Sequence, residues 1–339
     1  MSTLSRWAHQ INRGHRNTRS RGTKLAASVS RFAEATAAGT PDIYSHQPPV
    51  DCNELHYPAS RPPNPSRLRS CLCTRAQLES PAFRYWATSI HENWRLHRKL
   101  WEHCFILQSL FERDMLRGGR KGLGFAVGEE ALPSLMASLG CEVVATDLDV
   151  SDSRADVWAQ TAQLAAGLAT LNNKNLCDES IFRERVSFRP VDMNRIPHDL
   201  RGFDFTWSTC SFEHCGSIGL GKRFLREQMR CLKPGGIAIH TTEFNLSSNE
   251  ETVDNATTVL FRRQDIEAVI RDLQAEGHEV EKLQLDVGCY PEDEQVDIPP
   301  YSDNIHLKLE LYHRYVSTSV ALIVKKCTEL PLSLDAQGG

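Results

Sequence analysis

Short apolar segments alternate with amphipathic stretches from residue 120 to residue 326, and this alternation constrains the fold more than any other feature. Such an order of elements is typical of a doubly wound parallel sheet with helices on both faces. The expected strands are residues 122–126, 142–147, 186–190, 203–208, 236–241, 280–286 and 316–325. The expected helices are residues 129–139, 154–171, 219–232 and 263–276. The pattern therefore predicts an α/β fold with seven strands, the last two joined without an obvious crossover helix.

The chain before residue 120 differs in composition from the part that follows. Its first 40 residues contain seven Lys and Arg against one acid, and residues 41–65 contain seven prolines, which interrupt helices and sheets. Apolar residues three and four positions apart between 78 and 111 predict two packed helices, with Arg98 and Lys99 on a solvated face. We expect a largely disordered arm over 1–66, a helical segment over 67–119, the α/β domain over 120–327 and a tail over 328–339.

Charge and cysteine spacing exclude several classes of protein. Residues 1–75 carry 11 Lys and Arg against 4 Asp and Glu, whereas the rest carry 28 against 39. This acidic body disfavours a nucleic-acid partner. No apolar run approaches the ~18 residues of a membrane span, so we expect no membrane partner. The eleven cysteines form no C-x-x-C pair, which favours a cytoplasmic protein. Residues 1–40 also match the composition of a transit peptide, and import into an organelle is the alternative.

The first two expected strands end in residues suited to a nucleotide. The first runs through Gly122, Gly124, Ala126 and Gly128 directly into a helix, so that backbone N–H groups can approach a ligand closely. Asp147 closes the next strand, 19 residues after Gly128, where a carboxylate can accept hydrogen bonds from ribose hydroxyls. Together these signals predict a nucleotide-like ligand at this edge of the sheet.

Three further blocks complete the pattern: residues 203–208, Phe212-Glu213-His214, and the Arg-Cys-Leu-Lys-Pro-Gly-Gly turn over 230–236. With these blocks, residues 120–326 resemble the class I S-adenosylmethionine-dependent methyltransferases. The resemblance implies a Rossmann-like seven-stranded sheet with an antiparallel last strand and a metal-independent methyl transfer from S-adenosylmethionine. It implies cofactor contacts at Gly122, Gly124, Ala126, Gly128, Asp147, Leu148, Asp192, Met193 and Ser208. The family's glycine motif has an acid, which helps to hold the methionine end of the cofactor, where this chain has Gly122.

The resemblance to small-molecule and sugar O-methyltransferases also implies a catalytic pair. His214 follows the fourth strand and Glu243 the fifth, so both side chains are expected at the carboxyl edge, with His214 as general base and Glu243 orienting it. In the alternative, His214 caps the turn and Glu243 meets an arginine. Zinc binding by His214 with Cys210 and Cys215 is disfavoured because three ligands within six residues make poor chelate geometry.

The acceptor and two competing functions stay open at this point. We expect a small-molecule acceptor, such as a hydroxyl of a sugar or secondary metabolite, beneath an acidic loop over residues 286–303. An NAD(P)-dependent oxidoreductase is one alternative, although the chain has no Tyr-x-x-x-Lys motif. A non-catalytic binding protein with the same fold is the other, because Gly122 and Ala126 depart from the glycine motif. The sequence makes no prediction of the oligomeric state.

Overall fold

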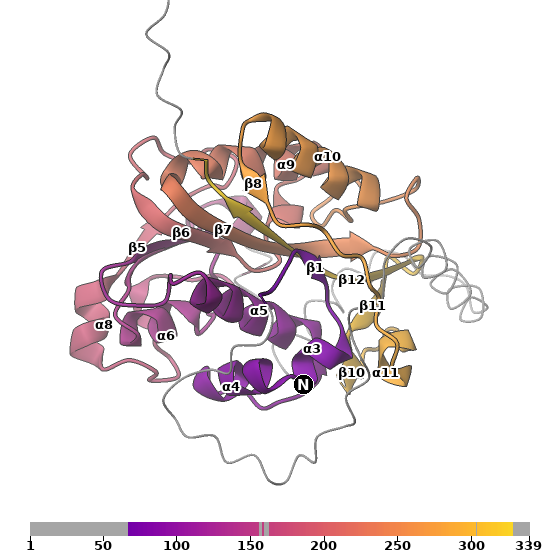
Figure 1. The fold of residues 1–339 in the computed structure, drawn as a ribbon, viewed down its shortest axis with the longest axis horizontal. Coiled ribbons are helices and arrows are strands. Elements are labelled where there is room, and N and C mark those ends of the chain that lie inside the picture. The colour runs from indigo at the N-terminus through magenta and orange to yellow at the C-terminus, as the bar shows by residue number, and fades with distance from the viewer. Residues whose placement is uncertain (1–66, 156–157, 159–162, 303, 328–339) are drawn as a thin grey trace, which may run out of the picture.

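The computed structural model describes residues 67–155, 158, 163–302 and 304–327, and a twisted sheet runs through this part of the chain (Figure 1). The strand order is β5-β4-β3-β6-β7-β12-β11-β9. Five strands are parallel to one another: β3 (Lys121–Gly124), β4 (Glu142–Asp147), β5 (Val186–Pro190), β6 (Phe203–Ser208) and β7 (Leu232–Asn245). The last strand, β12 (Tyr315–Lys325), is antiparallel to β7, as the resemblance implied.

The sheet is wider than expected. All seven predicted strands are present, and in the described residues β1 (Cys71–Leu72), β9 (Val296–Asp297) and β11 (Lys308–Leu311) bring the total to ten. The predicted strand over 280–286 is reduced to β8 (Glu279–Val280), because Gln284 donates its backbone N–H to Ser70 of the N-terminal segment instead. A separate two-stranded sheet joins β2 (Leu96–His97) to β10 (Ile305–His306).

Helices cover both faces of the sheet (Figure 1). One face carries α3 (Arg75–Glu79), α4 (Pro81–Ser89), α5 (Arg98–Glu112), α6 (Leu132–Ser138) and α8 (Glu179–Arg185), and the other carries α9 (Ile218–Glu227) and α10 (Arg263–Ala275). Phe205 and Trp207 on β6 pack into the first layer, while Leu123 and Phe125 pack into the second. The alternation of strand side chains therefore divides the core between the two faces.

The helix predicted over 154–171 does not run unbroken through the described residues of this range. Trp158 is helical, whereas residues 163–167 are not, and the 3-10 turns η2 (Ser153–Ala155) and η3 (Leu168–Thr170) stand at the two ends. Residues 156–157 and 159–162 lie outside the described part. The N–H of Ala165 donates to the Asp147 carboxylate, 3.0 Å away, rather than to a helical carbonyl. A contact with a strand end therefore replaces the local helical bond. Helix α8, capped by Asp178, was not predicted.

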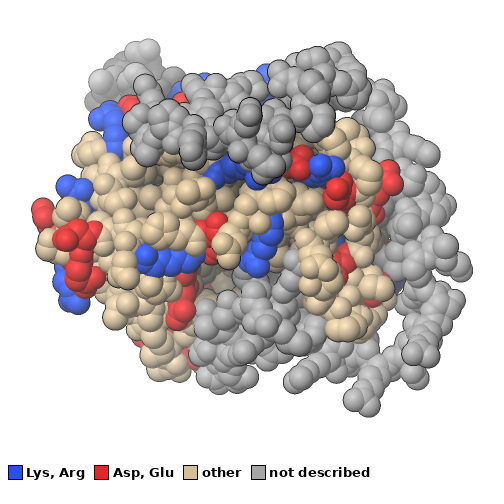
Figure 2. Space-filling model, turned by 90° about the horizontal axis from the view of Figure 1, so that it is seen from below, with Lys and Arg blue, Asp and Glu red and all other residues tan. Residues whose placement is uncertain are grey.

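The predicted arm over 1–66 and the tail over 328–339 lie outside the described residues. Within residues 67–327 as far as they are described, no helix is both long and apolar enough to cross a membrane. On the face seen in Figure 2, Lys and Arg side chains of the described residues are interspersed with Asp and Glu. That part of the surface therefore does not present a field of one sign.

Candidate active site at the carboxyl edge of the sheet

A cavity of about 750 Å³ opens where β3, β4 and β6 end. The turns that follow these strands form its walls, as expected for the carboxyl edge of a parallel sheet. The predicted residues that line it are Ala126, Gly128, Asp147, Leu148, Asp192, Met193 and His214. Gly122, Gly124, Ser208 and Glu243 are not on its wall. The sequence therefore located the cavity but misassigned part of its lining.

Gly122 and Gly124 make room for aromatic rings rather than for a ligand. A Cβ at Gly122 would lie 2.4 Å from the ring of Phe205, and one at Gly124 would lie 2.4 Å from that of Trp207. Gly128 is favoured at its position for a different reason, because its φ of +55° lies in the left-handed region that favours glycine. Its N–H donates to Asp147 Oδ2, at 2.9 Å.

Asp147 joins three backbone segments at the end of β4. Its Oδ2 accepts from Gly128 N–H and from Ala165 N–H, and its Oδ1 accepts from Leu148 N–H at 2.8 Å. Burial raises the pKa of this carboxyl to about 6, and the three N–H groups oppose that rise. The carboxylate thus holds the glycine turn while it lines the cavity.

Two polar residues of the cavity wall, Asn194 after β5 and Gln163, each have a buried side-chain atom without a hydrogen-bond partner among the described residues. Asn194 donates its backbone N–H to Asp192 and its side-chain amide to the carbonyl of Cys215. Among the described residues, the buried Oδ1 of Asn194 and the buried Nε2 of Gln163 have no hydrogen-bond partner. Both residues line the cavity. Such atoms suit a polar ligand, because leaving them unpaired costs free energy.

His214 ends the 3-10 turn η4 (Phe212–His214) on the cavity wall. Its Nδ1 lies 2.9 Å from the carbonyl oxygen of Thr257, and its ring packs against Trp158 with centroids 4.3 Å apart. Burial lowers the pKa of His214 to about 4, although the bond to Thr257 opposes this. The imidazole is therefore neutral at pH 7, and donation from Nδ1 to a carbonyl makes Nε2 the basic nitrogen.

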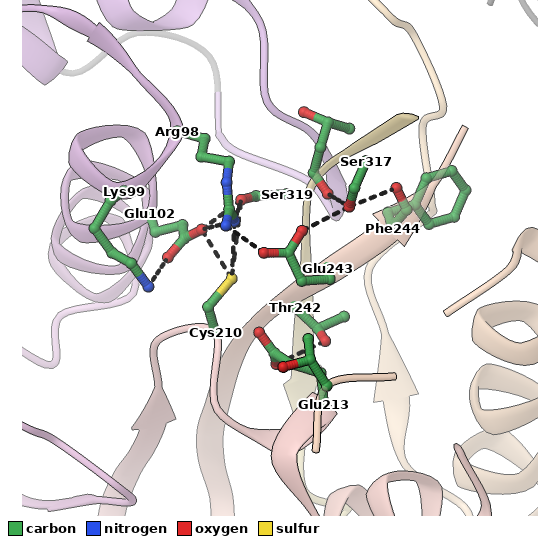
Figure 3. A network of polar contacts seen from close by, with 12 residues as sticks. Arg98, Lys99, Glu102, Cys210, Glu213, Thr242, Glu243, Phe244, Ser317 and Ser319 are labelled. Carbon is green, nitrogen blue, oxygen red and sulfur yellow. Dashed lines mark hydrogen bonds and ion pairs between the residues drawn. The ribbon is translucent and has the colours of Figure 1, made fainter. Parts of the chain in front are cut away.

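Glu243 does not orient His214 as the sequence analysis expected. One of its oxygens accepts from Arg98, and the other accepts from Ser317 Oγ at 2.6 Å (Figure 3). Of the described acids, Glu213 lies 3.9 Å from His214 Nε2. Glu243 pairs with an arginine, Arg98, as the alternative interpretation of the sequence expected.

The predicted solvated face of the second helix is also wrong. Arg98 on α5 is buried against the neighbouring strands β7 and β12, where it bonds Glu243 and Ser319, and it also bonds Glu102 of its own helix (Figure 3). Lys99 pairs with Glu102 at 3.0 Å and lines the cavity. Although burial acts in the opposite direction, Lys99 and Arg98 lower the pKa of Glu102 to about 2. An ionised network therefore fixes α5 to the sheet beside the cavity.

The loop after β6 connects this network to the cavity. Cys210 lines the cavity, has a φ of +45°, and donates its backbone N–H to Thr241 Oγ1 at 2.9 Å. Its thiol lies 3.0 Å from a Glu102 oxygen. Ligand atoms of Cys210, Glu213 and Glu243 lie within 4.8 Å of one another. Because Glu243 is already bonded to a guanidinium, this cluster does not suit a metal ion.

The acidic loop predicted to cover the cavity lies elsewhere. None of the described residues of 286–303 lines the cavity. Its acids pair with α3 instead, since Arg75 bonds Glu292 at 2.6 Å and donates its backbone N–H to Asp293 at 2.7 Å. Parts of the cavity wall come instead from α5 and from residues 255–257. His103 on α5 and Glu130 after the glycine turn also line the cavity and were missed.

Residues 123–240 match a family model described as a methyltransferase domain. A methyltransferase from Clostridium acetobutylicum, described as S-adenosylmethionine-dependent, is similar in fold, at 15% identity over 68% of this chain and 92% of that chain, with a TM-score of 0.39. The 1,6-didemethyltoxoflavin N1-methyltransferase of Burkholderia thailandensis, crystallised with S-adenosylhomocysteine, is 14% identical over 64% of this chain and 76% of that chain, with a TM-score of 0.37. A comparison with curated proteins gave no match.

The matched region contains the glycine turn, Asp147 and His214, so the fold and the cavity define an α/β enzyme with its site at the sheet edge. This enzyme is a methyltransferase that uses S-adenosylmethionine. The cavity fits that cofactor. Its wall carries the carboxylate of Asp147, and a carboxylate can accept hydrogen bonds from ribose hydroxyls.

Proposed function

We propose that the protein methylates a hydroxyl group of a small molecule, with His214 as the general base. The observation that carries this proposal is the state of His214, which is neutral, lies on the cavity wall and has its basic nitrogen set by Thr257. A base must be unprotonated to accept a proton from the attacking group. His214 meets this condition without the help of Glu243.

The protein's own residues position the reactants and move one proton. The cofactor supplies an activated methyl group bound to a sulfonium. Asp147, Asp192 and Asn194 would hold its nucleoside part, while His214 Nε2 takes the proton of the acceptor hydroxyl. Positioning of this kind removes much of the entropic barrier to a two-molecule reaction.

A sugar or secondary metabolite remains the acceptor class that we propose. The volume of about 750 Å³ lies within the range of small-molecule sites. Lys174 pairs with Glu92 on the wall, and Lys99 pairs with Glu102, which is not on the wall, so these charges do not form a field of one sign. This mixture suits a neutral polar acceptor. We also propose a cytoplasmic protein, in agreement with the free thiols of the ten described cysteines.

Replacement of His214 tests this function. We expect His214→Ala to lower turnover by about 10² to 10⁴, the usual contribution of a general base. Turnover would be followed as S-adenosylhomocysteine formed with a panel of sugars and phenols. Affinity for S-adenosylhomocysteine, measured by calorimetry, should stay nearly unchanged. The matched control is His198→Ala, because His198 is exposed and is not on the cavity wall. Full turnover in the His214 variant would remove the base from the mechanism.

A further inference from the structure

Glu130 is a buried acid that the proposed base chemistry does not use. It follows the glycine turn and lines the cavity, with its side chain 7% exposed. Its Oε1 accepts from the indole N–H of Trp207 at 2.7 Å, and its Oε2 lies 3.7 Å from His103 Nε2. The carboxylate is therefore fixed in orientation at the wall.

The groups in contact with Glu130 are neutral. The indole of Trp207 carries no charge, and burial lowers the pKa of His103 to about 4. Burial raises the pKa of Glu130 itself to about 7, although Trp207, Thr209 and Lys99 act against this rise. Two other buried acids, Glu102 and Glu243, differ, since each bonds Arg98. A cation that entered the cavity would stabilise the charged form of Glu130.

An aromatic ring occupies the space in which an acidic side chain at position 122 would lie. The resemblance places at that position an acid that holds the methionine end of the cofactor, but the ring of Phe205 fills the space that a side chain would take. Trp207 fills the space above Gly124 in the same way, and its N–H is the group that orients Glu130. The two rings therefore exclude an acid from the strand and position another on the cavity wall.

The order of the strands places Glu130 on the other side of the glycine turn from Asp147, the proposed contact of the cofactor's ribose. Strand β3 lies between β4, which ends in Asp147, and β6, whose Trp207 bonds Glu130. The two acids thus stand on either side of the glycine turn, and both line the cavity. An extended ligand with ribose at Asp147 would have its amino-acid end on the side of Glu130.

We propose that Glu130 binds the α-ammonium group of the methionine part of S-adenosylmethionine, in place of the acid that Gly122 lacks. This proposal rests on the cofactor assignment. A hydrogen bond between a carboxylate and an ammonium is charge-assisted and stronger than one between neutral groups.

Calorimetry with three ligands tests the role of Glu130. We expect Glu130→Gln to weaken the binding of S-adenosylmethionine and S-adenosylhomocysteine by about tenfold or more, the loss of one charged hydrogen bond. Binding of 5′-methylthioadenosine, which has the nucleoside but no amino-acid part, should not change. Glu142→Gln is the matched control, because Glu142 is exposed and is not on the cavity wall, so its replacement should leave all three affinities unchanged. The melting temperature of Glu130→Gln should not fall, since glutamine keeps an oxygen for Trp207 and needs no counter-charge.

The outcomes separate this role from the cofactor assignment. Equal losses for all three ligands would assign Glu130 to the shape of the cavity and overturn the proposal. Unchanged affinity of the variant, with tight binding by the wild type, would overturn the role of Glu130 alone. Failure of the wild type to bind S-adenosylhomocysteine would overturn the cofactor assignment as well.

Discussion

At the scale of single residues, burial sets the charge states around the cavity. Asp147 and Glu130 have raised pKa values, of about 6 and about 7, while the pKa values of His103 and His214 are lowered to about 4. Desolvation disfavours the charged form in each case, which moves acids and bases in opposite directions. The cavity wall thus carries fewer charges at neutral pH than its residue types suggest.

The pKa of His214 predicts the acid limb of the pH profile. Because burial lowers it to about 4, His214 should stay unprotonated as the pH falls from about 8 to about 5. Turnover at saturating cofactor should therefore be flat over that range and fall only as the pH approaches 4. An unperturbed histidine would give a midpoint near ~6.5. Circular dichroism at each pH separates this limb from unfolding, and a midpoint between about 6 and 7 would contradict the assignment.

At the scale of elements, α5 is attached to the sheet by buried charges as well as by its apolar stripe. Arg98 and Glu102 lie one turn apart and bond side chains of β7 and β12. Trp101 and Phe105 pack into the core of the same layer. The position of the helix is therefore specified by charged contacts, which allow fewer alternative arrangements than apolar packing.

If charged contacts fix the position of α5, removing one partner of the Arg98–Glu243 pair should lower the stability of the protein. We expect Glu243→Gln to lower the free energy of unfolding by about 3 kcal/mol, because it leaves the buried Arg98 with less compensation. The double variant with Arg98→Met should lose less than the sum of the single losses. Urea unfolding measures each value. As a control, Glu279→Gln removes the exposed pair with Lys325 and should change stability by less than about 1 kcal/mol. Additive losses would show that the two residues are not coupled.

The sequence predicted those elements whose bounds depend on the local residue pattern. It failed where contacts between residues far apart in the chain determine the structure. Strands β4 and β6 have their predicted bounds, because each is bounded by turns and largely buried. The helix predicted after β4 does not continue past Gln163, because Ala165 bonds Asp147 rather than a neighbour along the chain. Arg98 was placed in solvent because its partners Glu243 and Ser319 are 145 and 221 residues away. Asp147 and His214 were placed correctly on the cavity wall because each closely follows a strand.

At the scale of the whole molecule, the N-terminal segment belongs to the sheet. Strand β1 pairs with β12, and Ser70 accepts the N–H of Gln284 with its carbonyl and that of Ile323 with its hydroxyl. Strand β12 therefore pairs with β1 near the start of the described chain as well as with β7, β8 and β11. The described residues before 120 are thus joined to the sheet of the α/β domain.

Two truncations test this conclusion. A protein that begins at Arg67 should fold and bind S-adenosylhomocysteine, because β1 and Ser70 are retained. A protein that begins at Thr74 should be less stable or insoluble, since it lacks β1 and leaves backbone groups of β12 without partners. Thermal unfolding and calorimetry compare both with the full chain. Equal stability of the two truncated proteins would show that β1 is dispensable.

The attachment of α5 also fixes one wall of the cavity. Lys99 and His103 lie one turn apart on this helix, and any sliding of α5 would separate several buried charges at once. The side of the cavity that α5 forms therefore resists deformation, so that Lys99 and His103 keep constant positions on the wall whatever ligand enters.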